Sequence, residues 1–208
     1  MPDPVCVRCR GSLHTPETVG AWMCDAHGVV EPLHGALPAE THHLSDTASS
    51  SGVPVWVPWP MPPGWAVSGV RRTGGTGTAR AVAVGLMGPG VTARQAELVI
   101  VAEEPGVGLG ASYAGLESTD PGFEVSSLPV DARLTAGGHP TPLWSLPVSD
   151  RAAYVGEASG LWLWAIAWPV DEWMVVHDDL RLVDVRAPEH RALLAELPVA
   201  LLSPHLAQ

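Results

Sequence analysis

Short runs of apolar residues, separated by glycine-rich turns, occupy the middle of the chain and predict β-strands. Three of these runs are Trp65 to Arg72, Thr78 to Leu86 and Glu97 to Glu103. Gly74 and Gly90 mark the glycine-rich turns between them, and connections this short favour antiparallel neighbours. We therefore expect an antiparallel sheet in this part of the chain.

A second group of apolar runs predicts four further strands. They are Ala152 to Ala158, Leu161 to Trp168, Trp173 to His177 and Leu180 to Val185, with turns or breaks at Ser159-Gly160, Pro169 and Asp178-Asp179. Alternating residues along a strand face opposite sides of a sheet. In the run 161–168 one face is therefore Trp162, Trp164, Ile166 and Trp168, and the other is Leu161, Leu163, Ala165 and Ala167. Because both faces are apolar, we expect a central strand covered on both sides, with an aromatic platform for a ligand as the alternative.

One helix is predicted near the end of the chain, from Pro188 to Leu197. Proline suits the first turn of a helix, and Leu193, Leu194 and Leu197 share one face that can cover the sheet. The predicted fold class is therefore α+β and mostly β. A small N-terminal module, residues 1–35, precedes a largely antiparallel, Trp-rich sheet domain with a C-terminal helix, residues 53–208.

The segment between these two parts, residues 36–52, has no sustained apolar period and ends in serines. Its composition predicts a flexible linker. The adjacent His42 and His43 could bind a metal ion, although a solvated histidine pair is the simpler interpretation. The proline-rich arm that follows, Val53 to Trp65, is predicted to be extended. Its three tryptophans favour packing against the body over the alternative, a ligand for an SH3-type groove.

Composition and charge narrow the function classes for this chain of 208 residues. Its formal net charge is −11, with 11 basic residues against 22 acidic ones, and it contains no lysine. Residues 1–35 are themselves net negative by two, so the whole chain would be repelled by nucleic acid. Neither a secretory signal nor an apolar run of membrane-spanning length is recognisable. We expect a folded, acidic, cytoplasmic protein that binds neither nucleic acid nor membranes.

The N-terminal module contains all three cysteines, in two pairs of matched spacing. Cys6 and Cys9 form a Cys-x-x-Cys pair, and Cys24 and His27 form a Cys-x-x-His pair. This spacing is typical of zinc ribbons. Four protein ligands close the coordination shell, so the predicted zinc is structural and not catalytic. His14, His34, His42 and His43 are alternatives for the fourth ligand, but only His27 has the required spacing.

Local sequence around the two pairs supports a pair of metal-binding knuckles. Gly11 and Gly28 follow the pairs and are expected to supply positive φ where the backbone turns. Glu17 to Met23 and Val29 to Glu31 are expected to be short strands, with Trp22 covering the site. A redox-active Cys-x-x-Cys pair is the first alternative, although it lacks a preceding strand, and unliganded buried cysteines are the second.

The body contains weaker candidates for catalysis. The segment Gly106 to Gly110 superficially resembles a dinucleotide-binding loop, but Glu103 and Glu104 place negative charge where a pyrophosphate would bind. Carboxylates at predicted strand ends could converge on a cation or act as an acid/base pair, and Asp178 could orient His177 as a base. No serine lies in a nucleophile elbow. The candidate carboxylates are Glu103, Glu104, Glu157, Asp178 and Asp179.

A family resemblance extends over nearly the full length of the chain. It rests on Cys6-x-x-Cys9, Cys24-x-x-His27-Gly28, Val53-Pro54-Val55-Trp56, Pro63-Gly64-Trp65, Ala96-Glu97-Leu98-Val99, Glu103 to Gly110 and Gly160 to Trp164. With these motifs the chain resembles an uncharacterised family of actinobacterial proteins, a domain of unknown function with an N-terminal zinc ribbon. The resemblance implies a bacterial, cytoplasmic protein with metal ligands at Cys6, Cys9, Cys24 and His27, and it brings no known activity.

Two functions remain open. The first is a non-enzymatic, zinc-stabilised module for protein–protein interaction, scaffolding or regulation, with a protein partner. The alternative is an enzyme acting on a small metabolite at the strand-end carboxylates and the loop Gly106 to Gly110. An exposed apolar patch around Trp22, Trp56 or Trp59 would favour the first. A deep pocket gathering Glu103, Glu104 or Asp178 beside that loop would favour the second.

Overall fold

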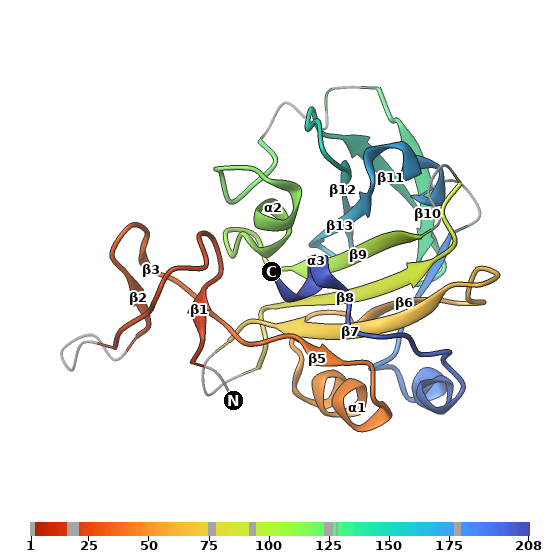
Figure 1. The fold of residues 1–208 in the computed structure, drawn as a ribbon, viewed down its shortest axis with the longest axis horizontal. Coiled ribbons are helices and arrows are strands. Elements are labelled where there is room, and N and C mark those ends of the chain that lie inside the picture. Colours follow the sequence, from red (N-terminus) through yellow and green to blue (C-terminus); the bar gives the residue numbers. More distant parts are fainter. Residues whose placement is uncertain are drawn as a thin grey trace.

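A curled, mostly antiparallel sheet forms the body of the protein in the computed structural model (Figure 1). The structure describes residues 3–15, 21–74, 78–91, 95–122, 127, 129–176 and 180–208. Within these residues the sheet has ten strands, and each pair of neighbours runs antiparallel except β10 and β14. In spatial order the strands are β5 (Leu37–Pro38), β7 (Ala66–Arg72), β8 (Ala81–Gly88), β9 (Ala96–Glu103), β13 (Leu161–Trp168), β12 (Ala152–Ala158), β11 (His139–Ser145), β10 (Ala132–Ala136), β14 (Arg181–Asp184) and β6 (Trp56–Pro58).

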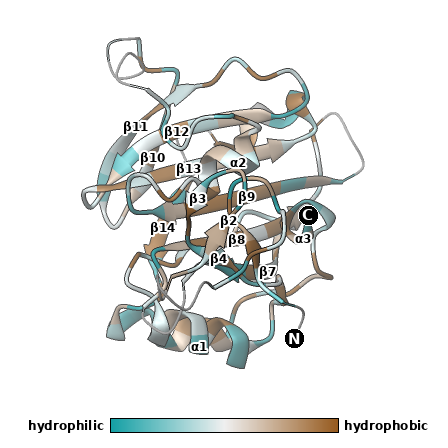
Figure 2. Ribbon diagram, turned by 90° about the vertical axis from the view of Figure 1, so that its left-hand side faces the viewer, coloured by the Kyte–Doolittle hydropathy of each residue, from teal (hydrophilic) through white to brown (hydrophobic). Residues whose placement is uncertain are grey.

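The central strands β8, β9 and β13 are apolar along almost their whole length, and they are buried on both faces. Figure 2 shows hydrophobic colours along these strands. In β13, Leu163 and Ala165 face one core, and Trp164 and Ile166 face the other, as the alternation predicts. The prediction of a central strand covered on both sides is confirmed. Because Trp164 has no exposed surface, it cannot be an open platform for a ligand.

Helices cover both faces of the sheet. The short helices α2 (Leu109–Ala114) and α3 (Pro204–Ala207) pack on the face that carries Trp164. Near β7 lie α1 (Thr41–Ser50) and the 3₁₀ helix η3 (Pro188–Ala195), which contact each other. The helix predicted to begin at Pro188 therefore exists, but it has 3₁₀ geometry and ends at Ala195.

The expectation of a flexible linker over residues 36–52 is wrong. Leu37–Pro38 pairs with β7 as an edge strand, and residues 41–50 form the helix α1. Ala39 and Leu44 are buried in the main core, and Thr47 is buried as well. Only a few apolar side chains anchor this segment, so its sequence lacks the apolar period of a packed element. Ala39 and Leu44 nevertheless pack into the core.

Two other parts of the body differ from the prediction. The expected strand from Trp173 to His177 is a 3₁₀ helix, η2 (Val170–Val176), and His177 lies outside the described residues. Strands β10 and β11 were not predicted, because prolines at positions 140 and 142 interrupt the pattern of β11. The first half of the proline-rich arm, residues 53–58, is buried as expected, and its residues 56–58 form the edge strand β6, whereas Pro60, Pro63 and Gly64 are exposed and lie in bends or turns.

None of the helices in the described part of the chain has the length and hydropathy that crossing a lipid bilayer requires.

Candidate metal centre

The N-terminal module consists of two small antiparallel strand pairs, which bring the cysteine-containing turns together (Figure 1). The pairs are β1 (Val5–Cys6) with β4 (Pro32–Leu33) and β2 (Met23–Cys24) with β3 (Gly28–Val29). Residues 17–20 of the predicted strand Glu17 to Met23 lie outside the described residues. Cys6 and Cys24 each end a strand, so both turns begin from a fixed backbone.

The two turns have the same hydrogen-bond pattern around their first sulfur. The Cys6 sulfur accepts backbone N–H groups from Arg8 and Cys9. The Cys24 sulfur accepts them from Ala26 and His27, at the same offsets. Backbone N–H groups that face a sulfur favour the thiolate, which is the form that binds metal. The matched spacing in the sequence thus corresponds to two matched turns in the structure.

The four side chains are brought together with separations that fit one tetrahedral ion. Cys9 Sγ lies 3.7 Å from Cys24 Sγ, and His27 Nδ1 lies 3.7 Å from Cys6 Sγ and 3.6 Å from Cys24 Sγ. A tetrahedron with ordinary zinc–sulfur and zinc–nitrogen bonds has S–S edges of about 3.8 Å and S–N edges of about 3.6 Å. All four ligand atoms lie within 4.8 Å of one another. The cluster is therefore compatible with a metal site such as zinc, and its sulfurs are too far apart for a disulfide.

The sulfurs differ in their surroundings. Hydrogen bonding from His27, followed by the N–H of Ala26, lowers the pKa of Cys24 to about 6. Burial raises the pKa of Cys6. Cys6 and Cys24 are buried, whereas Cys9 is exposed. One side of the cluster is thus open to solvent, and the other is enclosed by the module.

The turn residues are partly as predicted. Gly28 has a φ of +67°, but in the first turn the left-handed residue is Arg10, with a φ of +61°, and not Gly11. Gly11 is needed for space, because a Cβ atom there would lie 3.3 Å from Cys9 Sγ. The glycine therefore makes room for a ligand sulfur instead of relieving backbone strain.

Trp22 was expected to cover the cysteine cluster. Instead, Leu13 and Val30 pack against the buried Cys6 and Cys24. Trp22 is half-buried and lines a shallow hollow of about 330 Å³ beside Val5 and Leu13. Among the described residues, the other candidate histidines lie outside the cluster. His14 faces Asp25, His34 contacts the carbonyl of Gly74, and His42 and His43 lie near Glu40.

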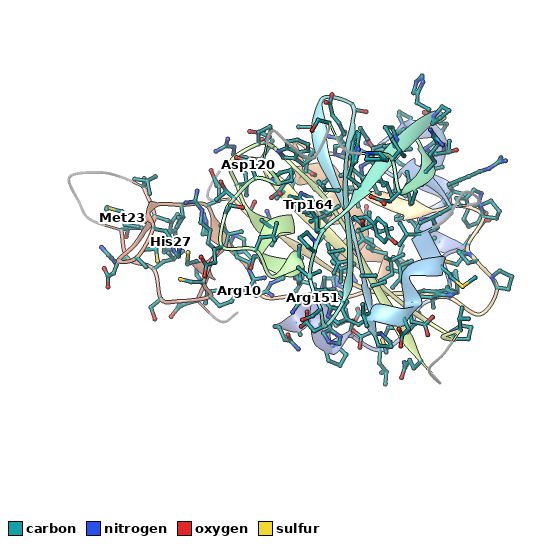
Figure 3. All side chains as sticks on the ribbon, turned by 90° about the horizontal axis from the view of Figure 1, so that it is seen from above. Arg10, Met23, His27, Asp120, Arg151 and Trp164 are labelled. Carbon is teal, nitrogen blue, oxygen red and sulfur yellow. The ribbon has the colours of Figure 1, made fainter. Side chains whose placement is uncertain are left out.

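The N-terminal module is docked on the body and is not a free appendage. Val7, between the first two cysteines, has no exposed surface and packs into the core beneath α2. Arg8 donates from Nη2 to the carbonyl of Gly106 at 3.1 Å. The guanidinium of Arg10 lies over the ring of Tyr113, 5.2 Å from its centroid. Figure 3 shows Arg10 between His27, on the module, and the body.

A second contact between module and body comes from the strand that leaves the second turn. Arg80 of the body binds Glu31 at 2.8 Å and Glu104 at 2.7 Å. The backbone N–H of Gly74 donates to the carbonyl of Pro32. Module and body residues together line a cleft of about 420 Å³; they are Arg8, Cys9, His27, Gly108, Ser112, Leu116, Glu117 and Ser118. The exposed side of the metal ligands faces this cleft.

The loop from Gly106 to Gly110 is filled by the protein itself. Glu103 has no exposed surface, and its Oε2 accepts the N–H of Leu109 at 2.6 Å. A Cβ atom at Gly110 would lie 2.2 Å from Cδ1 of Trp164, so this glycine lets the helix contact the indole. The carboxylate therefore occupies the position in which a nucleotide phosphate would lie, and the argument from charge against a dinucleotide loop agrees with the structure.

Burial dominates the chemistry of Glu103. Removal from water raises its pKa to about 7, although N–H groups of Gly110, Leu109 and Gly108 and the nearby indole of Trp164 favour the charged form. Among the described residues, neither Oε1 of Glu103 nor Nε1 of Trp164 has a partner in hydrogen-bonding geometry. In the described part of the chain no ion pair involves this carboxylate, so its charge is costly within the fold.

Asp120 supports the same loop from outside, and sequence reasoning did not identify it. Its Oδ1 accepts the N–H of Gly106 at 3.2 Å and the indole N–H of Trp162 at 3.0 Å. Figure 3 shows Asp120 on the side of the body that faces the module, and Trp164 farther inside the body. No local motif distinguishes Asp120 from a solvated loop aspartate. Trp162 is distant in sequence, and Gly106 binds through its backbone N–H, which any residue type could supply.

The described strand-end carboxylates do not converge on one site. Glu103 is enclosed, Glu104 forms the ion pair with Arg80, and Glu157 is an exposed residue opposite Trp162 in the β12–β13 pair. Asp178, Asp179 and His177 lie outside the described residues. Neither Glu103 nor Glu104 lines the cleft beside the loop.

Comparison with known proteins identifies a family for the chain. Residues 1–206 match a family of unknown function, DUF6758. No curated protein and no solved structure matches the chain.

Proposed function

The chain belongs to the DUF6758 family of unknown function, and we propose that it is a non-enzymatic zinc protein whose N-terminal ribbon is a protein–protein interaction or regulatory module. The observation that carries this proposal is the Cys3His cluster. One S–S and two S–N separations in it, of 3.6 to 3.7 Å, are close to the edges expected of a zinc tetrahedron. We further propose that the protein acts in the cytoplasm, where thiolates stay reduced.

A structural role for the zinc follows from its ligand set. Three thiolates and one imidazole fill a four-coordinate shell, which leaves no position for substrate or activated water. Such a small module has little core of its own, so metal binding contributes directly to its folding. The zinc would fix the first turn, and with it the contacts that Val7, Arg8 and Arg10 make with the body.

An interaction role is supported by the β2–β3 pair, which carries the second turn and lies on the side of the module away from the body (Figure 1). The β2–β3 pair carries Val29, which is 60% exposed, next to the half-buried Met23 and Trp22. The tryptophans Trp56 and Trp65 are buried in the body and offer no such surface. We therefore place the partner-binding surface on the second turn of the ribbon. The partner is a protein and not a nucleic acid, because the chain has a net charge of −11.

The alternative, an enzyme acting on a small metabolite, draws on the cleft beside Gly108. Its walls contain Ser112, Glu117 and the exposed Cys9. Against it, a Cys9 bound to zinc is no free nucleophile, and Glu103 is sealed inside the loop. The interaction module is therefore the proposal that we favour.

Metal analysis of the purified protein tests the zinc site. We expect about one zinc per chain, and Cys24→Ser should lose it because a hydroxyl is a poor replacement for a thiolate. His14→Ala is the matched control, since His14 lies in the same module outside the cluster. A metal-free wild type, or equal zinc loss in both variants, would contradict the proposal.

The interaction role needs a separate experiment. Val29→Asp places a charge on the exposed second turn and should abolish capture of a specific partner from extracts of the native cells. Val91→Asp is the control, because Val91 is a body residue with a similar exposure of 65%. Zinc chelation should have the same effect as Val29→Asp. Unchanged capture by Val29→Asp would mean that the ribbon is not the binding surface.

A further inference from the structure

A second group of metal-binding side chains lies at the start of α1, well separated in sequence from the cysteine cluster. It consists of Glu40, His42 and His43, whose ligand atoms all lie within 4.8 Å of one another. His42 Nδ1 is 3.4 Å from Glu40 Oε2, and the two imidazole rings are 4.0 Å apart at their centroids. Two imidazoles and one carboxylate therefore share one small volume.

The sheet fixes the imidazole of His43 in a state suited to metal binding. His43 Nδ1 lies 3.1 Å from the carbonyl oxygen of Pro38. A carbonyl only accepts hydrogen bonds, so Nδ1 carries the proton and the neutral ring has its lone pair at Nε2. Metal-binding histidines use this arrangement, in which one nitrogen is oriented by a carbonyl and the other binds the ion. Because Pro38 belongs to β5, the ring is anchored to the main sheet.

Glu40 is also free to act as a ligand. It occupies the N-cap position of α1, but its side chain makes no capping hydrogen bond and lies toward His42 instead. Its charge offsets the positive end of the helix dipole, which would otherwise oppose a cation. The helix contains no basic residue in its last turn, and the whole chain has a net charge of −11. The electrostatic surroundings therefore do not repel a divalent cation.

We propose that Glu40, His42 and His43 form a second, open site for a borderline divalent transition ion such as Ni²⁺, Cu²⁺ or Zn²⁺. Imidazole ligands select these ions over Mg²⁺ and Ca²⁺, which prefer oxygen. Three protein ligands leave coordination positions for water or for an oxygen of a bound anion. The side chains of His42 and Glu40 are 62% and 60% exposed, so those positions face solvent. This site differs from the cysteine cluster, whose four ligands close the shell.

Titration with Ni²⁺ tests the site in the full-length, zinc-loaded protein after removal of any histidine tag. Isothermal titration calorimetry should show about one Ni²⁺ per chain, bound without zinc release as followed with a chromophoric zinc indicator. His43→Ala should weaken binding by about 10-fold or more, and Glu40→Gln should also weaken it. Mg²⁺ should give no signal. Both residues lie at the surface, so circular dichroism should show unchanged folding.

His139→Ala provides the matched control, because His139 is an exposed histidine at the start of β11. Its affinity for Ni²⁺ should equal that of the wild type. The proposal is overturned if the wild type binds no Ni²⁺, if His43→Ala binds as tightly as the wild type, or if each Ni²⁺ bound releases one zinc. The last outcome would mean that the ion enters the cysteine cluster.

Discussion

The buried carboxyl of Glu103 predicts a dependence of stability on pH that a single substitution should remove. Glu103 has no exposed surface and no cationic partner among the described residues, and its pKa is raised to about 7. Glu103→Gln keeps the shape of the side chain and an oxygen that can accept the N–H of Leu109. The variant therefore removes the charge while leaving the packing almost unchanged.

The magnitude follows from the two pKa values. In the unfolded chain the carboxyl titrates near its usual 4.5, whereas in the folded protein it titrates near 7. The folded state thus binds the proton more tightly, so the free energy of unfolding falls as pH rises from 4.5 through 7. The whole fall is about 3 kcal/mol. About 2 kcal/mol of it should occur between pH 5.5 and pH 8.

Urea unfolding of both proteins across this pH range measures the effect. The difference in unfolding free energy between Glu103→Gln and wild type should grow by about 2 kcal/mol from pH 5.5 to pH 8, in favour of the variant. Comparing the two proteins at each pH cancels the contribution of the metal site, whose ligands also titrate. Glu157→Gln is the control, because Glu157 is exposed on β12.

Parallel stability curves for wild type and Glu103→Gln would refute the reasoning. They would mean that the carboxyl has the same pKa in the folded and unfolded chain. A variant that is less stable at every pH by a constant amount would point instead to lost hydrogen bonds. Only a difference that widens with pH identifies the buried charge.

Three further predictions concern packing and docking. Gly110→Ala should destabilise the protein by about 3 kcal/mol in urea unfolding, because its Cβ would overlap the fully buried Trp164. Leu44→Ala should lower the free energy of unfolding by about 2 to 5 kcal/mol, because Leu44 is fully buried. For the same reason the wild type should resist proteolysis between residues 38 and 52. Arg10→Ala should speed hydrogen exchange in α2 without loss of zinc, because it removes the contact with Tyr113.

Each of these predictions has a matched control. Ser112→Ala lies on the same helix as Gly110 and removes one hydrogen bond of 3.4 Å, so it should have little effect. Ser49→Ala is exposed on α1 and should leave protease resistance unchanged. Arg133→Ala removes an exposed arginine from β10 and should not alter exchange in α2. Equal effects of a variant and its control would contradict the assigned contact.

The sequence predicted the central part of the sheet well, because its strands are apolar on both faces. The run from Leu161 to Trp168 showed by alternation alone which side chains share a face, and both faces are covered. Strands β10 and β11 were missed because Thr141 and Leu143, which face the core, alternate with prolines. A proline can lie in this strand without breaking the fold, but its presence weakens the sequence signal.

Residues 36–52 show a different limit. A helix buried by few side chains, here mainly Leu44 and Thr47, has no apolar stripe that a sequence pattern can detect. Its order comes from contacts with β7 and η3, which are distant in sequence. The spacing of Cys6, Cys9, Cys24 and His27 was readable because ligand geometry is local to each turn. The docking of the module through Val7 and Arg10 could not be predicted from the sequence, because it depends on the tertiary position of α2.

The order of strands in the sheet has a consequence for the kind of partner that the protein can accept. One edge is β5, only two residues long and containing Pro38, and the other is β6, which contains Pro58 and is buried. Short edges and edge prolines leave few backbone groups free for pairing with another chain. Within the described residues, the main sheet is thus protected against edge-to-edge aggregation and cannot be extended by an added strand. A partner would therefore have to recognise side chains and surface shape instead of pairing its backbone with the sheet.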